Sequence, residues 1–237
     1  MCLFCLKLHS ATAALSLFVC SLHVASANAE PDVFWQLTSE CQAEIAQSCN
    51  DLGDLYFSGD GVAENEARAL ELYRKACGGG NGEGCYNTGY LYRSGYQVPA
   101  DPAAAVGFLG LGCDAGVAAA CTDLGLQYFD GLGVEADHEQ AVALFRQGCD
   151  GGNWTGCNNL GVQYSTGAGV PQDQERATAL YKKACAAGDL LGCANLGALY
   201  EVGTGVGKDL KRALQLYQLA CDGGNETGCE FLKDLTD

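Results

Sequence analysis

The chain has 237 residues, 15 cysteines and a formal net charge of −16. Its acidity disfavours nucleic acid and anionic lipid as partners, because their phosphates would repel it, whereas it allows a basic protein or peptide. Twelve of the cysteines lie beyond residue 29. Because their number is even and their density is high, they favour disulfides formed in an oxidising compartment.

The first segment, residues 1–29, has the pattern of an export signal. A short stretch with one lysine, Lys7, precedes a mostly apolar run at residues 11–25, and small residues follow. The run is too short for a comfortable membrane span, and the pattern is typical of a cleaved signal peptide. We expect cleavage after Ala27 or Ala29, with a retained anchor as the alternative. We therefore predict a periplasmic or secreted protein with no membrane span in its mature chain.

The remaining cysteines follow a strict period of 36 residues. Each pair has seven residues between its members, and no insertion or deletion interrupts the series. A fixed period of this size is typical of a solenoid of stacked units. The pairs are Cys41 and Cys49, Cys77 and Cys85, Cys113 and Cys121, Cys149 and Cys157, Cys185 and Cys193, and Cys221 and Cys229.

Each unit begins with a predicted helix. Cys157, Leu160, Gly161 and Tyr164 lie at i, i+3, i+4 and i+7, which is one helical face. Glycine inside a helix costs about 1 kcal/mol relative to alanine, so its recurrence needs a common cause. We infer that another helix crosses this face too closely for a Cβ. The recurring glycines are Gly53, Gly89, Gly125, Gly161 and Gly197.

A second helix follows in each unit, after a turn. Ala141, Leu144 and Phe145, followed by Gly148 and Cys149, again form a single helical face. A glycine after the first helix suits a left-handed cap, and a carboxylate or amide before the second helix suits an N-cap. The expected N-caps are Asn65, Asp101, Asp137, Asp173 and Asp209.

These patterns predict an all-α fold, an α/α superhelical solenoid of stacked 36-residue helix–turn–helix units stapled by disulfides. Residues 30–48 are expected to form an N-terminal capping half-unit that buries Phe34, Trp35 and Leu37, and residues 229–237 a capping helix. The five full units are expected at 49–84, 85–120, 121–156, 157–192 and 193–228.

The second unit departs most from the pattern. Gln97 replaces a turn glycine, and the second helix of this unit carries Gly107, Gly110 and Gly112. Because helical glycine is destabilising, we expect this unit to be the least stable.

The cysteine spacing favours bonds within each pair. Two antiparallel helices with a short connection bring the members of a pair together, whereas equivalent cysteines of neighbouring units would be separated by a helix-packing distance of about 8–10 Å. Zinc is disfavoured, because structural zinc sites use close C-x2-C spacings and because His138 is the one histidine after residue 29. A redox dithiol usually needs C-x-x-C in an electropositive setting. We predict no metal and no cofactor.

The search for catalytic residues gives none. Of the five serines after residue 29, none begins S-x-x-K, and neither K-T-G nor S-D-N occurs. The stretch at residues 203–209, GTGVGKD, has the wrong glycine spacing for a phosphate-binding loop, and Asp209 stands where such a loop needs Ser or Thr.

The unit at residues 157–188 resembles the Sel-one-like repeat (SLR) family, through N-L-G, Tyr, G-x-G-V, Asp, Ala and L-Y-x-x-A in that order. The 36-residue period and the cysteine pairs are similar to the exported, cysteine-rich Hcp-type branch, and the resemblance covers nearly all of the mature chain. It implies a TPR-like α/α superhelix that scaffolds protein–protein contacts. Some members carry penicillin-binding or β-lactamase assignments, so the resemblance also implies a weak hydrolase as the alternative.

A partner would bind on the concave face of such a superhelix. A row of Asn and Asp side chains there, the Asn/Asp row, could form hydrogen bonds with the backbone of an extended peptide, or could satisfy polar groups inside the solenoid. Asp54, Tyr90, Leu126 and Val162 lie one helical turn further on and should share a surface with this row. Trp154 could be an exposed anchor or a plug between units. We expect a monomer that binds a protein or peptide. The row consists of Asp51, Asn87, Asp123, Asn159 and Asn195.

Overall fold

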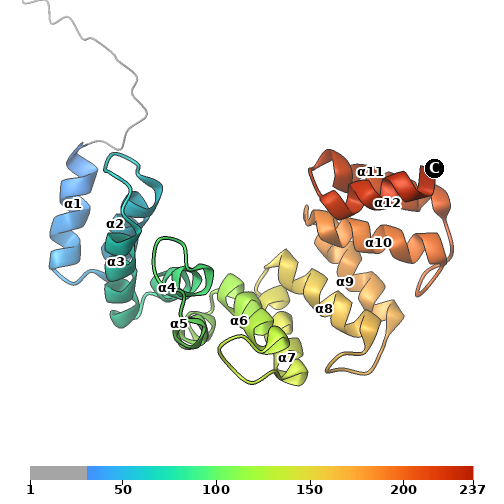
Figure 1. The fold of residues 1–237 in the computed structure, drawn as a ribbon, viewed down its shortest axis with the longest axis horizontal. Helices are drawn as coiled ribbons and strands as arrows, with labels where there is room; N and C mark the ends of the chain where they lie inside the picture. Colours follow the sequence, from blue (N-terminus) through green and yellow to red (C-terminus); the bar gives the residue numbers. More distant parts are fainter. Residues whose placement is uncertain (1–30, 237) are drawn as a thin grey trace, which may run out of the picture.

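The computed structural model describes residues 31–236, and the predicted signal segment at 1–29 lies outside them. Within the described residues the fold is twelve helices and no strand, joined by short turns (Figure 1). The helices are α1 (Pro31–Gln42), α2 (Ala46–Ser58), α3 (Glu66–Gly78), α4 (Gly82–Ser94), α5 (Pro102–Asp114), α6 (Ala118–Asp130), α7 (His138–Asp150), α8 (Trp154–Thr166), α9 (Gln174–Ala186), α10 (Leu190–Val202), α11 (Leu210–Asp222) and α12 (Glu226–Thr236).

The helices alternate between two roles. From α2 onward, each even-numbered helix is the first helix of a unit, and the odd-numbered helix after it packs against it as the second. Each first helix also touches the first helix of the next unit, from α2 and α4 through to α10 and α12. The closer approach of the first helices places them on the inner side of the curve, and the units follow one another along an open arc (Figure 1). None of these described helices is long and apolar enough to cross a membrane.

Six disulfides join the last turn of one helix to the first turn of the next. Each bonded pair is the local one, with Cα atoms 4.4–4.6 Å apart. The bonds lie between the second helix of one unit and the first helix of the next, so they fix the joints of the arc. The predicted disulfide-stapled α/α solenoid is confirmed.

The predicted caps begin and end the helices. The turn glycines after the first helices adopt φ values of 65° to 86°, in the left-handed region. The Asn or Asp before each second helix accepts a hydrogen bond from the backbone N–H three residues on, as Asp137 does from Gln140 at 2.9 Å. These local bonds explain why the turns recur without variation in length.

The helical glycines lie under large side chains of the second helix. A Cβ on Gly53, Gly161 or Gly197 would lie 2.6–2.7 Å from the ring of Tyr73, Tyr181 or Tyr217. In the two remaining members of the series, a Cβ on Gly89 would lie 2.8 Å from the side chain of Leu109, and a Cβ on Gly125 would lie 2.7 Å from the ring of Phe145. The expected close crossing is present, and its partner is a buried side chain of the same unit.

The expected burial of Trp35 needs correction. Trp35 is 67% exposed, because among residues 31–236 the main packing partner of α1 is α2, and Phe34 and Leu37 occupy the side that faces it. His138 and Trp154 are the first residues of α7 and α8. Gln97, which replaces a turn glycine, keeps the left-handed φ of 50° and donates a hydrogen bond to buried Glu66 at 2.7 Å.

Candidate functional site

The Asn/Asp row runs along the inner helices, and all five of its side chains are half-buried. Asn87 donates to Asn50 at 3.0 Å, and Asn195 donates to Asn158 at 2.8 Å. Both acceptors are buried and belong to the preceding unit. Part of the row is therefore used to join neighbouring units, which is the internal role that the sequence left open.

The other members of the row have nearer partners. Asp51 accepts from Gln47 on its own helix at 2.7 Å, and Asn159 accepts from Asn158 at 3.4 Å. Asp123 forms an ion pair across the joint between α4 and α6. These contacts still leave each side chain partly open to solvent, so the row remains a candidate contact surface.

A hollow of about 280 Å³ opens beside the row, at the joint between α2 and α4. Asp54 and Phe57 line it from α2, and Tyr73 lines it from α3. The side contributed by α4 consists of Tyr86, Asn87, Tyr90 and Leu91. Asp54 and Tyr90 are exposed at its rim, and the wall between them is mainly aromatic.

Asp54 is held by two hydrogen bonds. The Tyr73 hydroxyl donates to its Oδ1 at 2.7 Å, and Asn50 donates to its Oδ2 at 3.3 Å. Partial burial raises the pKa of Asp54 above its ordinary value, the bond from Tyr73 opposes this shift, and the charge of Asp51 adds to it. Burial and the bond to Asp54 together raise the pKa of Tyr73, which keeps the tyrosine protonated. The hollow thus contains an oriented carboxylate next to neutral rings.

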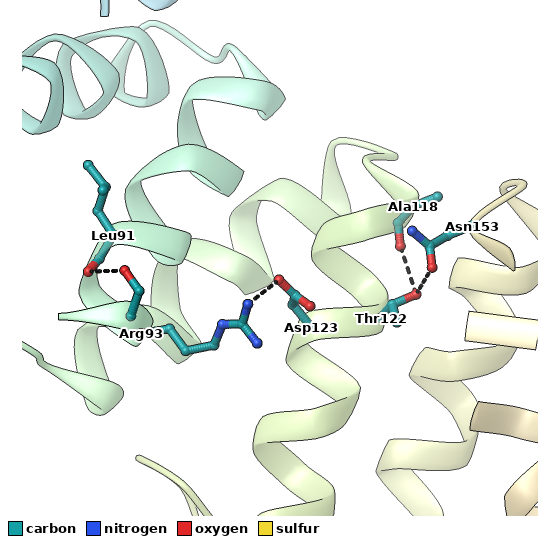
Figure 2. Close-up of polar contacts among 7 residues, drawn as sticks. Leu91, Arg93, Ala118, Thr122, Asp123 and Asn153 are labelled. Atoms are coloured by element: carbon teal, nitrogen blue, oxygen red, sulfur yellow. Dashed lines mark hydrogen bonds and ion pairs between the residues drawn. The ribbon is translucent and has the colours of Figure 1, made fainter. Parts of the chain in front are cut away.

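The equivalent joint one unit further on is filled by an ion pair. Figure 2 shows Arg93 reaching from α4 to Asp123 on α6, with Nη2 of Arg93 3.2 Å from Oδ2 of Asp123. The guanidinium also lies 5.7 Å from the ring centre of Tyr90. Burial raises the pKa of Asp123, and the charge of Arg93 opposes that shift. Because Arg93 corresponds to Phe57 and Asp123 to Asn87, the positions that line the hollow at one joint are bridged by an ion pair at the next.

A family model matches this chain five times. The Sel1 repeat model covers residues 46–81, 82–117, 118–153, 154–189 and 190–225. The chain belongs to the Sel1 repeat family. The model places each unit boundary at the first residue of a first helix, three residues before the boundary that we set at the cysteine.

Two solved structures are similar to this chain over most of its length. A protective antigen of uropathogenic Escherichia coli with an SLR fold is 30% identical, with a TM-score of 0.78 over 85% of this chain. This chain spans 43% of that protein's length. A Sel1 repeat protein from Oxalobacter formigenes is 23% identical, with a TM-score of 0.79 over 88% of this chain and 89% of its own.

A third match is cysteine rich protein B of Helicobacter pylori, 25% identical over 54% of this chain and 97% of its own, with a TM-score of 0.44. No curated protein matches the chain. Sel1 repeat proteins are generally non-enzymatic scaffolds for protein–protein contacts.

Two more features bear on the site of this Sel1 repeat protein. Trp154 is 37% exposed, and its ring lies 5.6 Å from Nζ of Lys183 in α9. Its indole thus lies beside the Lys183 side chain of α9 and still faces solvent. Within residues 31–236, no group of three or more His, Cys, Asp or Glu side chains could hold a metal ion.

Sequence reasoning found Asn87 and placed Asp54 and Tyr90 in one column beside the row, but it missed the other residues that line the hollow. Phe57 and Tyr86 stand at positions where the repeat varies, so they carry no periodic signal. Tyr73 reads as a core residue of the second helix, and its hydroxyl reaches Asp54 through the gap above Gly53. The available signal was the pair of tyrosines at residues 86 and 90, four positions apart and therefore on one face of the same helix.

Proposed function

We propose that the protein is an exported scaffold whose concave face binds an extended segment of a partner protein or a peptide. The observation that carries this proposal is the row of half-buried polar side chains on the inner helices, continuous with the aromatic hollow between α2 and α4. Polar groups held at fixed intervals can bond the backbone of an extended chain, and a hollow beside them can take one of its side chains.

The compartment and the type of partner follow from other features. The signal-like segment at 1–29 supports a periplasmic or secreted location, and six disulfides suit an oxidising compartment. A formal charge of −16 favours a basic partner and disfavours nucleic acid. In this proposal the protein acts as a monomer, and a single chain provides the whole inner face that binds the partner. The β-lactam alternative has the family resemblance alone behind it and is not proposed.

Site-specific photocrosslinking in the native compartment tests the function. A benzophenone amino acid replaces Tyr90 on the inner face in one variant and Leu214 on α11 in the control. Both residues are 38% exposed, so the two crosslinkers are equally accessible. We expect a defined set of partner proteins to be captured from position 90 and absent from position 214. Equal capture from both positions, or none from position 90, would contradict binding on the concave face.

A further inference from the structure

The hollow between α2 and α4 combines two kinds of group. Phe57 and three tyrosines supply aromatic surface, and Asp54 supplies the one charge among the lining residues. Aromatic rings attract cations through their negative faces, and a carboxylate completes the recognition of an ammonium or guanidinium group. A purely apolar ligand would have to desolvate the Asp54 carboxylate without replacing its contacts with water, which is unfavourable.

We propose that this hollow is a receptor for one lysine or arginine side chain presented by the partner. The inference rests on the proposed function and specifies the chemistry that the concave face selects. A volume of about 280 Å³ accommodates the alkyl stem and the charged head of either side chain. The stem packs along the rings of Tyr86 and Tyr90, and the head reaches Asp54.

The neighbouring joint contains an internal example of the same chemistry. There the chain's own Arg93 lies 5.7 Å from the ring centre of Tyr90 and 3.2 Å from the carboxylate of Asp123. Arg93 has the position at this joint that Phe57 has at the first joint, since Phe57 lies one period of 36 residues earlier in the chain. The fold therefore already holds a guanidinium between a tyrosine and a carboxylate at this place. At the first joint the positions of Tyr90 and Asp123 are taken by Asp54 and Asn87, so a carboxylate and aromatic rings are again present, in a different arrangement and with no basic lining residue.

Charge complementarity supports the same occupant. The protein has 29 acidic and 13 basic residues, so a basic segment is attracted before it makes any contact. The two hydrogen bonds that Asp54 accepts, from Tyr73 and Asn50, fix the carboxylate toward the hollow and leave room on its oxygens for a further donor. An incoming cation finds a preorganised acceptor, which lowers the cost of binding.

Three capped amino acids test the proposal on the unmodified mature protein. N-acetyl-lysinamide, N-acetyl-argininamide and N-acetyl-norleucinamide are titrated while the tyrosine ring resonances are followed by NMR. We expect the lysine and arginine probes to bind about fivefold to tenfold more tightly than norleucine, which has the stem but no charge. Equal or tighter binding of norleucine would overturn the proposal.

A matched pair of variants locates the site. Asp54→Asn keeps an acceptor for the Tyr73 hydroxyl but removes the charge, and it should bring the lysine probe close to the norleucine affinity. Glu44→Gln removes one negative charge from the exposed turn before α2, outside the hollow and the Asn/Asp row, and should change lysine binding less than twofold. Equal losses in both variants would show general attraction and no receptor. If Asp54→Asn fails to fold, the comparison of probes on the unmodified protein decides.

The outcomes separate this inference from the proposed function. Capture of partners from position 90 together with equal binding of all probes would leave the scaffold function intact and remove the basic-side-chain receptor. Tight binding of the lysine probe without any captured partner would do the reverse.

Discussion

Replacement of a helical glycine should have opposite effects at two places in this solenoid. In α8, a Cβ on Gly161 would lie 2.7 Å from Cε1 of Tyr181, whose ring is buried in the core. The better helix propensity of alanine is worth about 1 kcal/mol, and overpacking a buried site costs about 1–3 kcal/mol. With a contact this short we take the upper end, so Gly161→Ala should lower the free energy of unfolding by about 2 kcal/mol.

The matched control is Gly107→Ala in α5. This glycine is exposed, and an added Cβ would meet nothing within 4 Å. The propensity gain is then unopposed, and stability should rise by about 1 kcal/mol. Urea unfolding of the oxidised protein, followed by far-UV circular dichroism, measures both, and hydrogen exchange assigns the change to a unit because repeat proteins can open unit by unit. If Gly161→Ala were as stable as Gly107→Ala, the close contact with Tyr181 would not be the reason for the glycine.

Three further changes follow from the structure. Cys149→Ala with Cys157→Ala opens a ring of eight-residue separation, and loop-closure entropy puts the loss at about 2.5 kcal/mol in urea unfolding; a loss below about 1 kcal/mol would contradict the entropic account. Asp137→Ala removes the N-cap bond of α7 and should cost about 1 kcal/mol, whereas Asp137→Asn should retain most of it. The pKa values of Asp54 and Asp123 are raised by burial, so both carboxyls should titrate above 3.8 in carbon-13 NMR. Because the folded state then binds more protons than the unfolded chain, their contribution to stability should fall as the pH rises from 3.8 through their folded pKa values.

Local chemistry made most of the fold predictable. Helix faces, caps and disulfides depend on residues no more than eight positions apart, and the strict period repeats each signal several times. Gly167 after α8 and Asp173 before α9 show this: each fixes a helix end through its own backbone or side-chain bond. The Trp35 prediction failed because its burial depends on whether another helix follows on the far side of α1, which the local pattern does not contain.

The hollow could not be predicted in the same way. It depends on the side chains that meet across a joint, at positions that change from unit to unit. Phe57 lines the hollow where Arg93 forms an ion pair at the next joint, and Asn87 is neutral where Asp123 is the acidic partner of that pair. The period shows that these positions are equivalent but does not show which pairs of residue types leave a cavity. Three-dimensional packing decides that.

The ion pair beside the hollow should control how well the hollow accepts a cation. Arg93 shares the ring of Tyr90 with the hollow, and Asp123 neutralises its charge. Asp123→Asn would leave the guanidinium uncompensated at the rim, so lysine-probe affinity should fall by about twofold or more although no lining residue has changed. Arg93→Gln would leave the Asp123 carboxylate unpaired there, and affinity should rise. NMR titrations with the lysine and norleucine probes measure both effects, and norleucine binding should not follow them. A shift of the same sign in the two variants would mean that altered packing of the joint, and not charge, governs the hollow.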